Sequence, residues 1–182
     1  MNVTKNIFTL KVITFVALSS LFILACDDTS AQTDNNVIWQ RIVGIIEPGG
    51  TVGEIVDGTP APWTVSNGSA EVNLANGILK FQVRGLVIAA DPSFANIGTT
   101  TVITMVRGTL VCNETDDPEL VDTEAVPLSA QGDADFDGSV VLPESCADEP
   151  EDTVFLIRIA SVSEGFEFLI GLWNAFGAVR IP

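Results

Sequence analysis

The residue spacing with the clearest chemical meaning is an acidic run in the last third of the chain. The pattern D-x-D-x-D-G-x5-E is filled by Asp133, Asp135, Asp137, Gly138 and Glu144. In an EF-hand loop the acidic positions supply oxygen ligands to Ca²⁺, and the glycine makes the sharp turn between them. The spacing therefore predicts a candidate calcium site made of four carboxylates.

The residues around this run favour a second interpretation. An EF-hand needs a helix on each side, whereas Pro143 stands where the exiting helix would begin and the apolar run Val140-Val141-Leu142 is typical of a strand. In a strand, alternate side chains share one face. The three aspartates would then be solvated on the outer face of a strand, with no metal.

The composition narrows the chemistry further. The 182 residues include 24 acidic and 8 basic side chains, a net charge of −16, and neither histidine nor tyrosine. A histidine-based triad and a histidine-ligated metal are excluded. Nucleic acid is not an expected partner, because it binds through Lys and Arg. We expect no catalytic residue and no cofactor other than calcium, although paired carboxylates leave a hydrolase as an alternative.

The N-terminal residues have the composition of an export signal. Lys5 and Lys11 precede an apolar run over 12–25 that is interrupted only by Ser and Thr. The run is shorter than the roughly 20 residues that cross a bilayer, and it matches the core of a signal peptide. The sequence thus predicts a signal peptide rather than a membrane-spanning helix.

The end of this run places a cysteine in a distinctive setting. Phe22-Ile23-Leu24-Ala25-Cys26 resembles the bacterial lipobox, in which a cysteine receives lipid and becomes the mature N-terminus. The resemblance implies a signal peptide over 1–25, a lipidated Cys26 with a polar tether over 26–36, and anchorage to a membrane of the cell envelope. Cleavage after Ala31, which would give a secreted or periplasmic protein, is the alternative.

Three cysteines are an odd number for an exported protein. If Cys26 takes lipid, Cys112 and Cys146 remain for one disulfide in an oxidising compartment; two buried free thiols are the alternative. The two cysteines precede acidic segments at 114–124 and 148–152. A disulfide would bring these segments to one end of the domain, as a solvated rim or as a shared calcium site.

Residues 37–182 are expected to form a single all-β domain. No stretch keeps a helical apolar spacing for three turns, and short runs rich in Val, Ile, Thr and Phe alternate with Gly, Pro, Asn and Asp. We predict an antiparallel two-sheet β-sandwich. The expected strands cover 37–46, 51–56, 69–75, 78–88, 100–112, 124–129, 134–142, 153–161 and 166–180.

One hairpin is predicted in detail. Asn76-Gly77 is a favoured pair for a two-residue type I′ turn. With these two residues as the loop, Leu74 faces Leu79 and Val72 faces Phe81. Apolar pairs then share one face and polar pairs the other, so the turn and the hydrophobic pattern agree.

The order of several short motifs resembles uncharacterised bacterial secreted β-sandwich domains. The resemblance rests on Ala61-Pro62-Trp63, Val83-Arg84-Gly85-Leu86-Val87, Gly132-Asp133-Ala134, Val141-Leu142-Pro143, Cys146 and Trp173-Asn174-Ala175-Phe176-Gly177. It spans residues 40–178. It implies a disulfide-bearing β-sandwich outside the cytoplasm and no activity.

These observations favour a binding or structural role. Trp39, Trp63 and Trp173 could line a sugar-binding surface, but their apolar surroundings favour packing in the core. We predict a non-enzymatic cell-envelope lipoprotein or secreted β-domain that is structural or binds a ligand, a protein or a glycan. A calcium-dependent binding module and a carboxylate-based hydrolase are the alternatives.

Overall fold

The computed structural model describes residues 35–52, 56–92 and 95–181. All of them belong to one compact unit, Thr33–Pro182. The predicted signal peptide, the lipidation at Cys26 and most of the tether lie outside the described residues. None of the helices in the described part has the length and apolar character needed to cross a membrane.

The described residues are mostly antiparallel β-strand, which confirms the all-β prediction. The strands are β1 (Asn36–Gly44), β2 (Thr51–Val52), β3 (Val56–Asp57), β4 (Trp63–Thr64), β5 (Asn67–Asn73), β6 (Ile78–Arg84), β7 (Val87–Ile88), β8 (Ile103–Cys112), β9 (Glu119–Asp122), β10 (Val126–Pro127), β11 (Ala134–Ser139), β12 (Val154–Val162) and β13 (Trp173–Ile181). The helical segments are α1 (Ser145–Asp148), η1 (Pro150–Asp152) and η2 (Glu167–Leu169).

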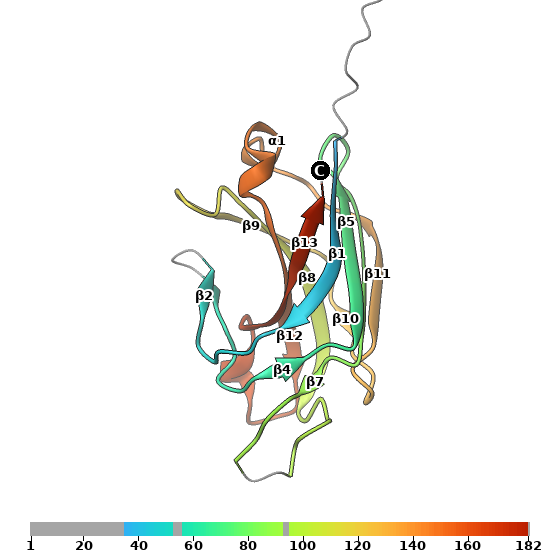
Figure 1. Cartoon of the computed structure of the whole chain (residues 1–182), viewed down its shortest axis with the longest axis vertical. Helices are drawn as coiled ribbons and strands as arrows, with labels where there is room; N and C mark the ends of the chain where they lie inside the picture. The colour runs from blue at the N-terminus through green and yellow to red at the C-terminus, as the bar shows by residue number, and fades with distance from the viewer. Residues whose placement is uncertain (1–34, 53–55, 93–94, 182) are drawn as a thin grey trace, which may run out of the picture. The chain divides into compact units, whose positions relative to one another are not determined.

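Most strands join one curled sheet. Within the described residues this nine-stranded sheet has the order β10-β8-β12-β13-β1-β5-β6-β11, with β9 paired to β8, and two small sheets consist of β2-β3 and β4-β7. The sheet curls until its end strands β10 and β11 are in contact (Figure 1). A sandwich of two separate sheets is not confirmed, because β1 pairs with β13 and with β5 and so joins the two halves.

The hydrophobic core lies inside the curl. Trp39 of β1 and Phe81 of β6 both contact Phe155 of β12, with ring centroids 5.6 and 5.7 Å apart. β6 buries every second residue of ILKFQVR toward this core and exposes Lys80 and Gln82. Strands at a distance in the sheet are therefore packed face to face by aromatic contacts.

The β5–β6 hairpin has a different register from the predicted one. Val72 lies opposite Leu79, so the loop contains four residues, 74–77. The carbonyl of Asn73 accepts the N–H of Gly77 at 2.8 Å, and the Asn73 side chain accepts two further loop N–H groups. The side-chain cap of Asn73 thus outweighs the two-residue turn. A shift of two residues keeps the same side chains on the buried face.

Candidate functional site

The acidic run of the predicted calcium site forms strand β11. Asp135 and Asp137 are exposed on its outer face, where they alternate with covered residues. Asp135 forms an ion pair with Arg84 at 2.6 Å, and Asp137 forms one with Lys80 at 3.0 Å. The period of the strand therefore turns both carboxylates toward cations on the neighbouring strand β6.

The other two predicted ligands lie beyond the ends of β11. Asp133 accepts a hydrogen bond from the backbone N–H of Gly85 at 3.0 Å. Glu144 is exposed at the N-cap of α1, after Pro143. The described residues contain no group of three or more His, Cys, Asp or Glu side chains that could hold a metal ion. A strand stands where an EF-hand has a loop, so the four carboxylates are not brought together.

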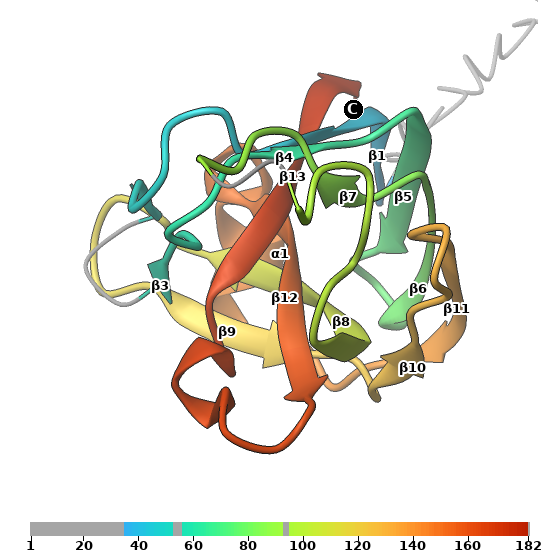
Figure 2. The same cartoon turned by 90° about the horizontal axis from the view of Figure 1, so that it is seen from below.

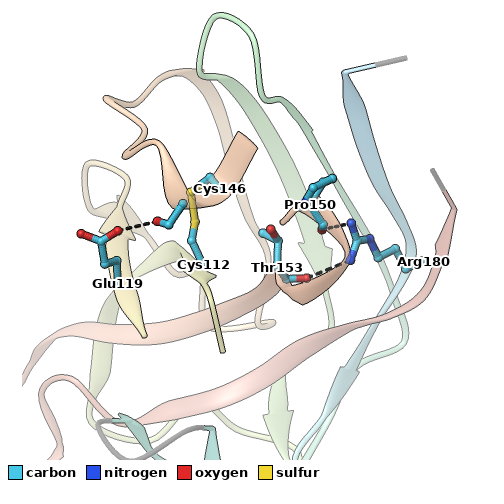
Figure 3. The surroundings of a disulfide bond; sticks show 7 residues. Cys112, Glu119, Cys146, Pro150, Thr153 and Arg180 are labelled. Atoms are coloured by element: carbon cyan, nitrogen blue, oxygen red, sulfur yellow. Dashed lines mark hydrogen bonds between the residues drawn. A yellow bond between two sulfur atoms is a disulfide. The ribbon is translucent and has the colours of Figure 1, made fainter. Parts of the chain in front are cut away.

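The disulfide between Cys112 and Cys146 is present. Cys112 ends β8, Cys146 lies on α1, both side chains are buried, and the two Cα atoms are 4.8 Å apart (Figure 3). The bond brings the two acidic segments to one end of the unit, as expected. There the hydroxyl of Thr115 donates to the carboxylate of Asp152 at 3.1 Å.

Further hydrogen bonds order this end of the unit. The hydroxyl of Ser145 donates to Glu119. Arg180 of β13 donates to the carbonyls of Pro150 and Thr153 (Figure 3) and also to that of Glu151. Desolvation lowers the pKa of Arg180, and the negative charge of Glu151 acts in the opposite direction. These contacts are those of a hydrogen-bonded acidic rim around the disulfide.

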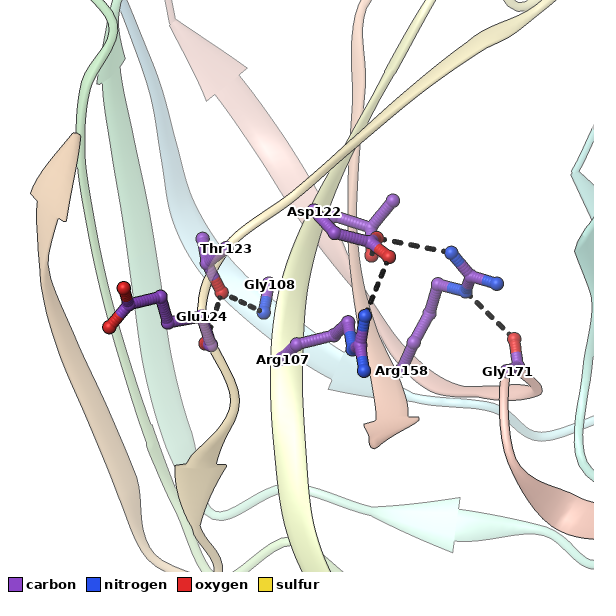
Figure 4. Close-up of polar contacts among 8 residues, drawn as sticks. Arg107, Gly108, Asp122, Thr123, Glu124, Arg158 and Gly171 are labelled. Carbon is purple, nitrogen blue, oxygen red and sulfur yellow. Dashed lines mark hydrogen bonds and ion pairs between the residues drawn. The ribbon is translucent and has the colours of Figure 1, made fainter. Parts of the chain in front are cut away.

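A second polar cluster is centred on Asp122 of β9. Its carboxylate accepts hydrogen bonds from Thr109 at 2.6 Å, Arg107 at 2.9 Å and Arg158 at 3.1 Å (Figure 4). Arg158 also donates to the carbonyl of Gly171 at 2.7 Å. Because one carboxylate engages both guanidinium groups, the cluster cross-links β8, β9 and β12 and does not form an open anion site.

The tryptophans are in the core. Trp39 is 2%, Trp63 is 3% and Trp173 is 6% exposed. Their rings cannot stack on a sugar at the surface. Packing, the favoured interpretation of the sequence, is confirmed for all three.

An apolar groove of about 870 Å³ lies at the end of the unit that carries β4 and β7, the lower end of Figure 1. Part of its wall comes from three loop regions, at Pro48, at 60–62 and at 88–102, and Phe166, Phe168 and Leu169 of the η2 segment form the rest. Phe166 is 40% and Phe168 71% exposed, with ring centroids 6.4 Å apart. Exposed aromatic side chains beside a cavity of this size are typical of a binding site.

The walls of the groove are held by backbone hydrogen bonds. The N–H of Ala89 donates to the carbonyl of Pro62 at 2.9 Å, and the N–H of Ile88 donates to Thr99 at 3.0 Å. The first bond extends the pairing of β4 with β7 by one residue, and the second joins β7 to the loop that follows it. Both strands lie toward the viewer in Figure 2. Proline adds rigidity because its φ angle is fixed. The groove is thus already formed in the free protein.

Acidic side chains lie in and beside the groove. Asp91 lines it and accepts a hydrogen bond from Asn96 at 2.6 Å. Glu167 lies between the two exposed phenylalanines, and hydrogen bonds from the backbone N–H groups of Gly165 and of Glu167 itself lower the pKa of its carboxyl. The wall residues come from stretches 42–79, 85–106 and 159–179, which contain neither Lys nor Arg.

Sequence reasoning missed this groove. The predicted strand over 166–180 included Phe166 and Phe168, whereas β13 begins at Trp173 and η2 precedes it. Gly165 and Gly171 have φ angles of +91° and +93°, which favour glycine and bracket the turn. The paired glycines around a short apolar segment were the available signal.

The described fold is therefore an all-β unit with a curled antiparallel sheet and one disulfide. No protein-family model matches the chain, and no curated protein or solved structure shows significant similarity to it. Its function is inferred from the chemistry of its own surface.

Proposed function

We propose that this protein is a non-enzymatic binding domain displayed on the cell envelope, with the apolar groove as its binding site. The exposure of Phe166 and Phe168 beside the groove is the observation that carries the proposal. Burying a large apolar side chain gains roughly 1.5–3 kcal/mol. A partner that covers both rings therefore has a substantial driving force, and a preformed groove reduces the ordering cost of binding.

Export and anchoring are part of the same proposal. Cleavage of the signal peptide over 1–25 leaves Cys26 at the mature N-terminus, where its lipid holds the domain on a membrane through the tether over 26–36. The Cys112–Cys146 disulfide supports an oxidising compartment, since such bonds are rare in the cytoplasm. Release after cleavage at Ala31, as a secreted or periplasmic protein, is the alternative.

The chemistry of the side chains also supports a binding role. The chain has no histidine or tyrosine, and the carboxylates of Asp122, Asp135 and Asp137 are in ion pairs with cations.

We further propose that the two halves of the curled sheet act as the layers of a β-sandwich, as in the bacterial secreted domains that the sequence resembles. The two halves meet at Phe81 and Phe155.

Cysteine labelling in intact cells tests the binding site. With Thr101→Cys, at an exposed polar residue of the groove lining, a membrane-impermeant maleimide should label the purified protein freely and the protein in cells several-fold more slowly, because a partner covers the groove. Val141→Cys is the matched control, since Val141 is 92% exposed and does not line the groove. Equal labelling of Thr101→Cys in both settings would contradict the proposal.

Metabolic labelling tests the anchor. Cells that process bacterial lipoproteins should incorporate labelled palmitate into the protein, and Cys26→Ser should abolish this incorporation and release the protein from the membrane fraction. Incorporation that survives Cys26→Ser would disprove lipidation at this residue.

A further inference from the structure

The geometry points to one class of occupant for the groove: we propose that it binds a short apolar segment of another protein that is flanked by lysine or arginine residues. This inference rests on the proposed function of the groove as the binding site. It adds the chemistry of the partner.

The surface of the groove selects apolar side chains. Among the described residues, most of the lining is aliphatic, proline or phenylalanine, and the polar side chains are those of Asp91, Asn96 and Thr101. A sugar or a charged metabolite needs several converging hydrogen-bond partners. The described lining offers few of them, whereas aliphatic and aromatic side chains of a peptide would be desolvated against its apolar wall.

The acidic side chains around the opening of the groove, which form its rim, favour a partner with positive charge. Asp91 lies at the groove, Glu167 between its two phenylalanines, Glu164 shortly before them, and Glu47 next to the wall residue Pro48. Glu47, Glu164 and Glu167 are exposed. Arg158, which reaches the carbonyl of Gly171 after η2, is paired with Asp122. A partner with cations on both sides of its apolar segment therefore meets complementary charge. Such complementarity raises the association rate and the specificity.

The same charges disfavour two other occupants. A second copy of this chain would place an acidic rim against an acidic rim, and each chain carries a net charge of −16. Fatty acids and anionic lipid headgroups would also carry negative charge to the rim. A basic, apolar peptide segment is the occupant that satisfies both the lining and the rim.

The groove and the start of β1 lie at opposite ends of the described unit. β1 contains nine residues, from Asn36 to Gly44, and a strand of that length spans about 30 Å. Asn36 follows the proposed tether, whereas Gly44 precedes the groove wall at Pro48. The groove therefore opens at the far end of β1 from the proposed attachment point (Figure 1).

Peptide binding to the full chain tests the inference. Three fluorescent peptides share one apolar centre of Leu, Val and Phe and are flanked by lysines, by glutamates or by serines. With the protein in nanodiscs of zwitterionic lipid, and empty nanodiscs as the blank, fluorescence anisotropy should show that the lysine-flanked peptide binds at least tenfold more tightly than the glutamate-flanked one. Its affinity should fall as salt is added, because the rim charges are exposed.

Matched variants locate the binding. Phe168→Ala should weaken the lysine-flanked peptide about tenfold, the effect expected for one large apolar contact, and Val141→Ala should not. Glu167→Gln should weaken only the lysine-flanked peptide, whereas Glu71→Gln, an exposed acid on β5, should leave all three affinities unchanged.

The outcomes separate this inference from the proposed function. Equal, Phe168-dependent binding of all three peptides would overturn the basic flanks and keep the groove as a binding site. Binding that ignores Phe168→Ala would assign the affinity to surface charge and overturn the groove. If no peptide binds, Phe168-dependent self-association in sedimentation would identify a second copy as the occupant, and its absence would overturn both proposals.

Discussion

Gly108 of β8 and Phe81 of β6 lie against each other across the core. A Cβ atom on Gly108 would stand 2.9 Å from two ring carbons of Phe81 and 3.0 Å from the ring of Phe155. β8 and β6 are not neighbours in the sheet, so only the curl of the sheet brings them together. The missing side chain at Gly108 gives the two phenylalanine rings room to pack.

Substitution of this glycine should weaken the fold. We expect Gly108→Ala to lower the free energy of unfolding by about 1–3 kcal/mol, as overpacking does in well-filled cores, which urea titration would measure. Gly50→Ala is the matched control, because the nearest atoms to its Cβ position are 3.6 Å away. A loss no larger than that of the control would contradict the packing described here.

Reduction of the disulfide should destabilise the same unit. The sequence separation of Cys112 and Cys146 is 34 residues, and loop-closure entropy for a loop of this length corresponds to about 3–4 kcal/mol. A reducing agent, or Cys112→Ala combined with Cys146→Ala, should lower the urea midpoint accordingly. The shift should be the same in a Cys26→Ser background, and an unchanged midpoint on reduction would count against the prediction.

The cluster around Asp122 should contribute more to stability than the ion pairs of β11. The side chain of Arg158 is 15% exposed, so Asp122→Asn leaves a mostly desolvated cation without its carboxylate, and we expect a loss of about 1–3 kcal/mol. In the pair of Lys80 and Asp137 the side chains are 55% and 70% exposed. Asp137→Asn should therefore change the stability by less than about 1 kcal/mol. Thermal melting of both variants compares them, and equal losses would argue against this ranking.

Calcium should leave the stability unchanged. Ion pairs hold Asp135 and Asp137 on β11, and Glu144 lies apart on α1. Millimolar Ca²⁺ should therefore not raise the melting temperature. A rise that is abolished by Asp135→Ala and by Asp137→Ala would restore the calcium site predicted from the spacing.

Local pattern predicted much of the fold. The alternation of β5 and β6 identified the buried face of the hairpin correctly, because that face depends only on a period of two residues. The register depended on whether Asn76-Gly77 formed a two-residue turn or the side chain of Asn73 capped a longer loop. The structure has the longer loop, with residues 74–77. The pairing of Cys112 with Cys146 was predicted correctly because the lipobox resemblance set Cys26 aside and left only these two cysteines.

The groove could not be predicted in the same way. Phe166 and Phe168 belong to an apolar run that is indistinguishable by composition from the run at Phe155, yet Phe155 is fully buried. Exposure depends on which segments cover a side chain, and the groove is assembled from three stretches that are distant in sequence. The acidic motif at 133–144 was misleading for a different reason. Its spacing fits a calcium-binding loop, but residues 134–139 form strand β11, and the geometry of a strand excludes that loop.

The two end strands of the curled sheet also bear on how the protein behaves at high concentration. An open strand edge can pair with the edge of another chain and start aggregation. Here β11 carries Asp135 and Asp137, and β10 contains Pro127, which has no N–H to donate. Both end strands therefore resist edge-to-edge growth, which should limit polymerisation of the protein through β10 and β11.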